Sequence, residues 1–139
     1  MTSPAILFSI LLCVCTCAVS VFAAPSEVVS LPRPNAERVQ EMAVYAAVYY
    51  NLRSTDQFAF KVTKVLDVQT TINGGVVYSM DVLLSRTHCP NGRTPNLESC
   101  ALFSSPPEAQ TLRCHFVVLS EPLDDQKSLL DSSCTVTSQ

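Results

Sequence analysis

The stretch "TTINGGVVY", residues 70–78, places Asn73-Gly74 between two runs rich in β-branched residues. An Asn-Gly pair in this setting is the strongest short-range signal of a β-hairpin, because a type I′ turn requires positive φ at both central residues. We therefore predict a tight hairpin turn at Asn73-Gly74. Only three glycines occur in the 139-residue chain, and two of them, Gly74 and Gly75, lie in this stretch.

Alternating apolar and polar residues on both sides of the turn predict two long β-strands. The first begins at Phe58, with a bulge between Val62 and Val65 where the alternation slips by one residue. The second covers residues 76–86, and its apolar face consists of Val76, Tyr78, Met80, Val82 and Leu84.

Two further strands are predicted after this hairpin. One covers residues 110–119, and its apolar face consists of Leu112, Cys114, Phe116 and Val118. The other covers residues 128–136 and follows a turn at Pro122-Leu123-Asp124-Asp125.

A single long helix is predicted ahead of the strands. Asn35 is a favourable N-cap, and Glu37 places a negative charge in the first turn, where the helix dipole favours an anion. A mostly apolar stripe then recurs at spacings of three and four residues: Val39, Met42, Ala43, Ala46, Tyr49, Tyr50 and Arg53. One helix of about 18 residues followed by four strands predicts an α+β fold, with the helix packed on a four- to five-stranded antiparallel sheet.

The N-terminal region has the pattern of a secretory leader. An apolar stretch over residues 5–21 precedes the first charged residue, Glu27, and small residues at Val21 and Ala23 suit signal peptidase. We predict a signal peptide over residues 1–23, cleaved after Ala23, and a secreted, extracellular protein. A transmembrane anchor is the alternative, but the run is short and is followed by Pro25 rather than by basic residues.

The remaining chain is predicted to form an extended N-terminal arm over residues 24–34, which contains three prolines, and one domain over residues 35–139. Its formal net charge is -3, and it has no basic run. This balance argues against nucleic acid as a partner and, after signal cleavage, against a membrane.

Four cysteines remain after the leader is removed: Cys89, Cys100, Cys114 and Cys134. An even number in an oxidising compartment favours two disulfides, and three pairings are possible. His88 and His115 each adjoin one of these cysteines, which raises zinc as an alternative. Neighbouring residues on a strand face opposite sides and cannot easily bind one ion, so we predict disulfides and no metal.

No catalytic constellation is apparent in the sequence. It lacks the G-x-S-x-G, H-E-x-x-H, P-loop and dinucleotide-binding motifs. The four cysteines leave no free thiol to act as a nucleophile, and the adjacent acids Asp124 and Asp125 are typical of a solvated turn. We predict that the protein is not an enzyme.

Three stretches resemble the type-2 (secreted) cystatin family: "AVYYN" at 47–51, "YSMDVLLSRTHC" at 78–89 and "PNLESC" at 95–100. The resemblance covers the predicted mature chain and implies the disulfides Cys89–Cys100 and Cys114–Cys134. It also implies reversible inhibition of papain-like, cathepsin-type cysteine proteases, without a cofactor. Members of that family block the protease cleft with an N-terminal arm ending at glycine, a Q-x-V-x-G hairpin and a Pro-Trp hairpin.

The matching positions in this chain depart from each of these patterns. The Q-x-V-x-G motif aligns with Thr71-Ile72-Asn73-Gly74-Gly75, where only the final glycine is kept. Gln69 lies two positions before the glutamine of the motif, and only a register slip would bring it to the tip of the hairpin. Pro122 matches, but Leu123 replaces the tryptophan. In the arm, Leu31 offers an apolar side chain, and Pro32 falls near the hinge glycine.

The resemblance therefore implies a divergent protease-binding wedge. Losing about two anchoring side chains would weaken inhibition by roughly 10- to 10⁴-fold. The alternative function is a non-inhibitory secreted interaction or structural protein on the same scaffold. A domain-swapped dimer is a further expectation, because a helix–strand unit joined through a hairpin can exchange between copies. The Ser54-Thr55-Asp56 loop lacks the asparagine with which some cystatins inhibit legumain, so that activity is not predicted.

Overall fold

The computed structural model describes residues 33–93 and 96–137. The predicted signal peptide over 1–23, the arm as far as residue 32, and with them Leu31 and Pro32, lie outside this part of the chain. Within the described residues, no helix combines the length and apolar character needed to cross a membrane.

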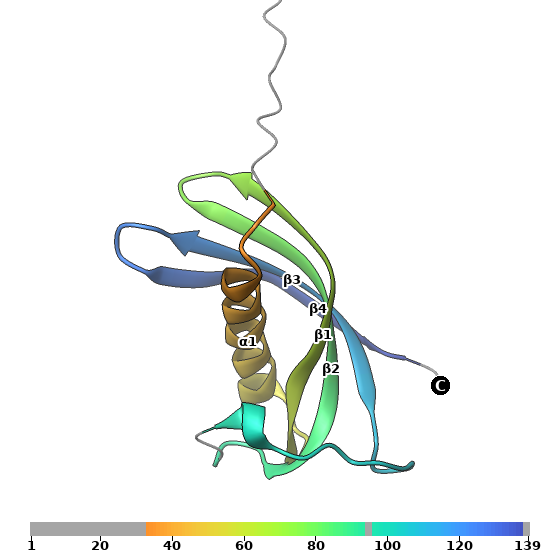
Figure 1. The fold of residues 1–139 in the computed structure, drawn as a ribbon. Helices are drawn as coiled ribbons and strands as arrows, with labels where there is room; N and C mark the ends of the chain where they lie inside the picture. The colour runs from red at the N-terminus through yellow and green to blue at the C-terminus, as the bar shows by residue number, and fades with distance from the viewer. Residues whose placement is uncertain (1–32, 94–95, 138–139) are drawn as a thin grey trace, which may run out of the picture.

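One helix packs across the concave face of a curved antiparallel sheet (Figure 1). The helix, α1, spans Ala36–Arg53, and a short 3-10 helix, η1, spans Leu97–Ser99. The four strands of the described chain pair in sequence order: β1 (Phe58–Ile72), β2 (Val76–Pro90), β3 (Thr111–Glu121) and β4 (Gln126–Val136). The predicted α+β fold is confirmed, with four strands in the described residues.

The start of α1 follows from its sequence. The Asn35 side chain accepts a hydrogen bond from the backbone N–H of Glu37 at 2.8 Å, which satisfies one of the otherwise unpaired donors of the first turn. The helix has 18 residues, and its buried side chains are Val39, Met42, Ala43, Ala46, Ala47 and Asn51. Four of these six belong to the predicted apolar stripe, which is therefore the face that meets the sheet.

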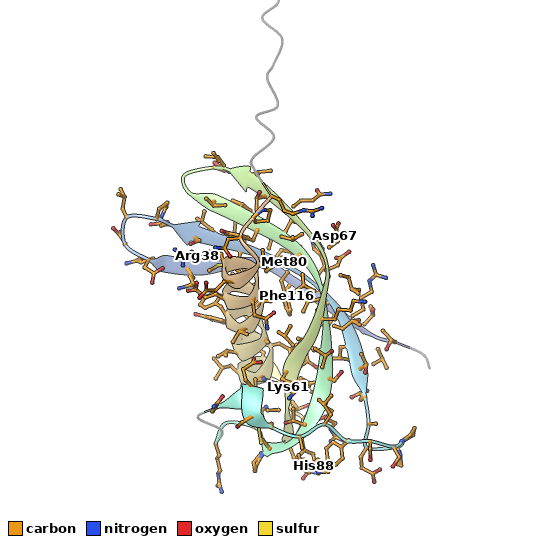
Figure 2. All side chains as sticks on the ribbon, viewed as in Figure 1. Arg38, Lys61, Asp67, Met80, His88 and Phe116 are labelled. Atoms are coloured by element: carbon orange, nitrogen blue, oxygen red, sulfur yellow. A yellow bond between two sulfur atoms is a disulfide. The ribbon has the colours of Figure 1, made fainter. Side chains whose placement is uncertain are left out.

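The core lies between α1 and the sheet, where Met80 and Phe116 are fully buried (Figure 2). The predicted apolar faces of the second and third strands supply most of it, through Tyr78, Met80, Val82, Leu84, Leu112, Cys114, Phe116 and Val118. A fully buried side chain of this size contributes about 2 kcal/mol to folding. The strand alternation thus places the main apolar mass beneath the helix.

β1 and β2 form a long hairpin that bends around α1. Val62 pairs with Leu84, Lys64 with Leu83 and Val65 with Val82, which leaves Thr63 as an extra residue. The bulge predicted between Val62 and Val65 is confirmed, and further register shifts flank it. Bulges increase local twist and bend, so they allow one hairpin to curve along the helix.

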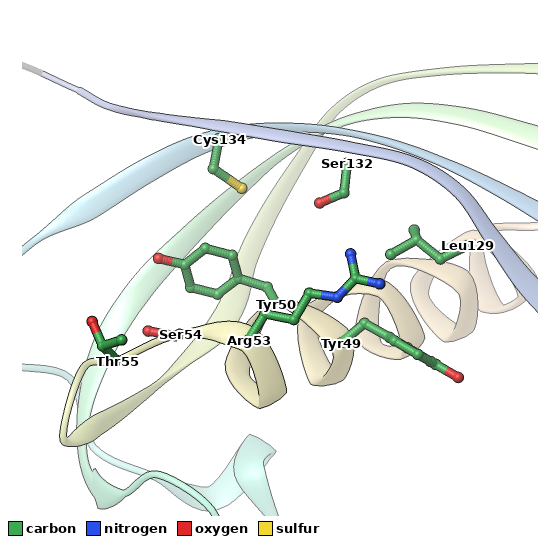
Figure 3. Close-up of a pocket in the computed structure, with 8 residues that line it drawn as sticks. All are labelled: Tyr49, Tyr50, Arg53, Ser54, Thr55, Leu129, Ser132 and Cys134. Carbon is green, nitrogen blue, oxygen red and sulfur yellow. The ribbon is translucent and has the colours of Figure 1, made fainter.

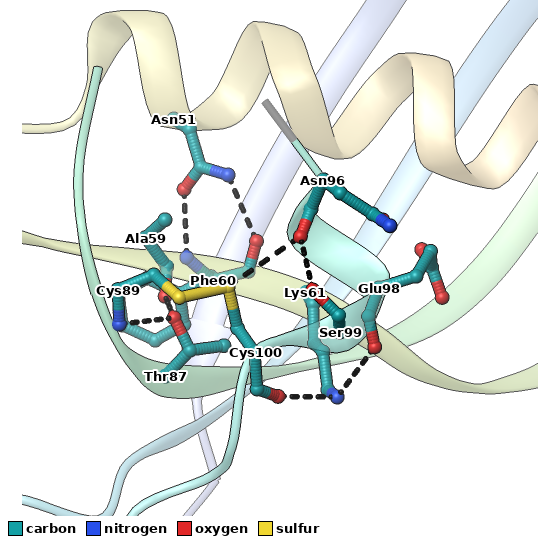
Figure 4. Close-up of a disulfide and its surroundings, with 10 residues drawn as sticks. All are labelled: Asn51, Ala59, Phe60, Lys61, Thr87, Cys89, Asn96, Glu98, Ser99 and Cys100. Carbon is teal, nitrogen blue, oxygen red and sulfur yellow. Dashed lines mark hydrogen bonds between the residues drawn. A yellow bond between two sulfur atoms is a disulfide. The ribbon is translucent and has the colours of Figure 1, made fainter. Parts of the chain in front are cut away.

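Both disulfides have the pairing that the family resemblance implies. Cys114–Cys134 joins β3 to β4, and Cys89–Cys100 ties the end of β2 to the segment around η1 (Figure 4). The Lys61 ammonium donates to the Cys100 carbonyl at 2.6 Å, which fixes this segment to β1 as well. β2 extends to Pro90, four residues beyond its predicted end, where it still pairs with Phe58 at the start of β1.

Candidate functional site

The loops of the two hairpins lie together at one end of the sheet (Figure 1). Val76, the first residue of β2, pairs with Ser120, next to the last residue of β3. The loop between β1 and β2 and the loop between β3 and β4 therefore leave the sheet side by side. The N-terminal end of α1 lies at the same end of the molecule.

The first loop consists of Asn73, Gly74 and Gly75, because Ile72 pairs directly with Val76. The predicted two-residue type I′ turn is wrong: φ is positive at Gly74 (70°) but not at Asn73. A three-residue loop needs only one left-handed residue, so a single glycine meets the requirement. The Asn73 N–H donates to the Gly75 carbonyl at 3.0 Å and closes the loop.

Gly75 has a different role from Gly74. A Cβ atom at Gly75 would lie 2.6 Å from the carbonyl oxygen of Ser120 and 3.1 Å from Cδ1 of Leu119, whereas one at Gly74 would meet nothing within 4 Å. The first loop thus rests directly on the backbone of β3. Glycine at this position lets the two loops approach each other.

The register of β1 decides which residues reach this loop. Gln69 pairs with Ser79, Thr71 with Val77 and Ile72 with Val76, without a shift. Gln69 therefore stays within the strand, and the tip carries Ile72 and Asn73. The Ile72 side chain is 67% exposed although it is large and apolar.

The second loop, Pro122 to Asp125, presents its apolar side chain to solvent. Leu123 is 96% exposed, the highest exposure among the large apolar side chains described in the structure. Asp125 has a φ of 51°, a left-handed conformation that turns the chain into β4. Ile72 and Leu123 are thus exposed apolar residues at the ends of neighbouring hairpins.

Four charged side chains link the second loop to α1. The Lys127 ammonium lies 2.9 Å from Glu41 Oε1 and 3.5 Å from Asp125 Oδ1, and Arg38 lies 2.8 Å from Glu41 Oε2 and 3.6 Å from Asp125 Oδ1. We call these four residues the charge clamp. The hydrogen bonds from Lys127 and from Arg38 lower the pKa of Glu41, and the bond to Glu41 raises the pKa of Lys127. The charges of Glu41 and Lys127 are thus stabilised by their neighbours.

An uncharged hydrogen bond also connects α1 to the start of β4. The Tyr45 hydroxyl donates to the Lys127 carbonyl at 2.8 Å. Burial, followed by the hydrogen bond with Tyr49, raises the pKa of Tyr45 to about 12, so the hydroxyl keeps its proton at physiological pH. Helix α1 therefore holds both the backbone and the side chain of Lys127.

The sequence is similar to those of known proteins. The sequence matches the family model for the Cystatin domain over residues 27–123. The chain belongs to the cystatin family. A cystatin of Coturnix japonica is 34% identical over 102 residues, which are 73% of this chain and 87% of that protein. Human cystatin-SA is 33% identical over 100 residues, covering 72% of this chain and 70% of its own.

The fold agrees with that membership. The crystal structure of dimeric human cystatin F superimposes with a TM-score of 0.70 at 24% identity, covering 75% of this chain and 82% of the other. Membership places this cystatin in a family of cysteine protease inhibitors rather than of enzymes.

This cystatin also has a groove that lies apart from the two hairpin loops. It has a volume of about 470 Å³ and runs between the C-terminal part of α1 and β4, with Arg53 extending across it (Figure 3). Its lining is Tyr49, Tyr50, Arg53, Ser54, Thr55, Leu129, Ser132 and Cys134. Among these residues the one sulfur is in a disulfide and no histidine is present, so the groove brings together no nucleophile and base.

The sequence interpretation placed the loop residues of this cystatin but missed the charge clamp. Arg38 and Glu41 are recognisable as an i,i+3 pair on a helix. Nothing in the sequence indicates that Lys127 and Asp125 complete the set, because they lie on a distant hairpin.

Proposed function

We propose that this cystatin inhibits papain-like cysteine proteases reversibly by inserting its two hairpin loops into the active-site cleft. The first hairpin contributes Thr71 and Ile72 from the end of β1 and the loop residues Asn73, Gly74 and Gly75, and the second loop contributes Pro122 and Leu123. Leu31 and Pro32 of the arm complete the proposed wedge. The observation that carries the proposal is the exposure of Ile72 (67%) and Leu123 (96%) on adjacent loops at one end of the sheet.

Blocking by such loops requires no chemistry from the inhibitor. Both loops are short and closed by strand pairing, so they lose little conformational entropy when they bind. Their exposed apolar tips can enter substrate subsites, where burial of each would be favourable. A rigid turn does not present an extended peptide to the catalytic cysteine, which explains how the loops can occupy the cleft without being cut.

The differences between the loop tips and the family pattern determine the affinity that we expect for the protease. A tryptophan anchor commonly contributes about 2 kcal/mol or more at an interface, and Leu123 retains only part of that apolar surface. Thr71 and Asn73 replace two further residues of the family pattern. We propose a divergent wedge and an inhibitor of moderate affinity.

The proposed site of action is outside the cell. The match to the family begins at residue 27, just after the predicted cleavage at Ala23. The two disulfides also fit an oxidising compartment. Self-association by exchange of the helix and β1 through the first loop is proposed as well; size-exclusion chromatography tests it, and a single monomer peak at every concentration would contradict it.

A titration of papain and of a cathepsin with the folded mature chain tests the proposed function. We expect reversible, competitive inhibition that weakens in Leu123→Ala and in Ile72→Ala, both of which remove mainly exposed side-chain atoms outside the core. The absence of inhibition at tens of micromolar would exclude the proposal and favour the non-inhibitory alternative.

A further inference from the structure

The second loop is held on two sides by different means. On its β3 side, Ser120 pairs with Val76 and lies in contact distance of Gly75, so this limb is joined to the first loop. On its β4 side, Lys127 and Asp125 join α1 through the charge clamp. The tip residue Leu123 lies between these two attachments.

The β4 limb needs the second attachment. Asp125 adopts a left-handed φ of 51°, a conformation that costs most L-residues about 1 kcal/mol and that aspartate tolerates better than most. Asp125 Oδ1 forms ion pairs with two cations of the clamp, Lys127 at 3.5 Å and Arg38 at 3.6 Å. Lys127 is only 16% exposed, and the Tyr45 hydroxyl binds its carbonyl. Of the two cations that retain Asp125, Arg38 belongs to α1, and Lys127 belongs to β4 but is itself held to α1 by Glu41 and Tyr45.

We propose that Lys127 is a positioning residue of the inhibitor, acting through the charge clamp to fix the direction in which Leu123 points relative to the first loop. The inference rests on the proposed function, since it concerns how the second loop is presented to a protease. The clamp has this effect because it connects the loop to α1, whose buried face is packed against the sheet. Lys127 itself does not contact the protease in this arrangement.

The positioning role can be separated from a contribution of Lys127 to global stability. Partly exposed ion pairs contribute little to global stability, so removal of Lys127 should shift the melting temperature by only about 2 °C. Its effect should appear instead in the ordering of residues 121–127. Loss of that ordering increases the entropy that binding must remove.

The first experiment measures inhibition constants against papain for five variants, including Leu123→Ala as a background. Lys127→Met keeps the apolar stem but loses the charge, and we expect a rise of about 3- to 10-fold in the inhibition constant. Lys127→Arg should restore inhibition. Arg113→Met, which removes an ion pair to Asp81 at 3.4 Å away from the loops, is the matched control and should leave inhibition unchanged. In a Leu123→Ala background, Lys127→Met should have no further effect.

The second experiment does not depend on a protease. Backbone ¹⁵N order parameters of residues 121–127 should fall from about 0.85 towards 0.6 in Lys127→Met and stay unchanged in Arg113→Met. Unchanged order parameters, or a Lys127→Met effect that persists in Leu123→Ala, would overturn the positioning role. If the wild-type chain fails to inhibit papain, the proposed function is wrong, and the order parameters alone then decide whether the clamp orders the loop.

Discussion

Replacement of Gly75 by alanine tests the contact between the two hairpins. The added Cβ would lie 2.6 Å from the Ser120 carbonyl oxygen and 3.1 Å from Cδ1 of Leu119. The leucine atom can move aside, but the carbonyl belongs to a backbone held by pairing with Val76. Relief therefore requires the first loop to move away from β3.

The cost can be bounded from the geometry. Forcing a methyl group against fixed backbone typically destabilises a protein by about 1–3 kcal/mol. For a chain of this length that corresponds to a fall of roughly 4–12 °C in melting temperature. The same movement separates Ile72 from Leu123, so inhibition should weaken more than in a variant that is equally destabilised elsewhere.

Gly74→Ala is the matched control for the stability measurement, because Gly74 belongs to the same proposed wedge as Gly75. Its Cβ meets nothing within 4 Å, and its cost comes only from the positive φ of 70°, about 1 kcal/mol. Guanidinium denaturation gives the free energies of unfolding, and a papain titration gives the inhibition constants. If Gly75→Ala is as stable and as inhibitory as wild type, the close approach to Ser120 is absent and the reasoning fails.

Three further predictions follow from the same contacts. Leu123→Trp should lower the papain inhibition constant about 10-fold, because it supplies a larger aromatic anchor; an unchanged constant would mean that Leu123 does not enter the cleft. Asn51→Ala should cost about 2–3 kcal/mol in denaturant, because it leaves the N–H and the carbonyl of Phe60 unpaired at a buried position. The free energy of unfolding should fall as pH drops below about 4. In the folded protein, the hydrogen bond with His115 lowers the pKa of Asp81, and the hydrogen bond with Lys127 lowers the pKa of Glu41. The two carboxylates therefore stabilise the fold above their unfolded-state pKa values, and this stabilisation is lost when they are protonated. Melting curves should then show a shallower acid loss for Asp81→Asn than for wild type, with Asp124→Asn at the exposed turn as the control.

Local signals predicted most of the elements. The Asn35 cap and the stripe from Val39 define α1, and the slip in alternation locates the bulge near Thr63, because caps and periodicity depend on neighbouring residues. The turn type was wrong because the sequence cannot reveal that Ile72 pairs with Val76. That pairing decides whether one residue or two must be left-handed.

The site was predictable only in part. The family resemblance placed Gly75 and Leu123 on the hairpin loops, but neither residue alone indicates its surroundings. The need for glycine at position 75 arises from Ser120, and the attachment of the second loop arises from Glu41 and Lys127. Such contacts between distant segments form only when the sheet order and the position of the helix are both known.

The amide of Asn51 has a consequence for self-assembly. It donates to the Phe60 carbonyl at 2.8 Å and accepts from the Phe60 N–H at 2.9 Å (Figure 4), as a residue of a neighbouring antiparallel strand would do. Among the described strands β1 lies at one edge of the sheet, and these groups point away from β2. A side chain from the helix thus occupies the position where a strand from another molecule could begin to pair, and it closes this part of the sheet edge to aggregation.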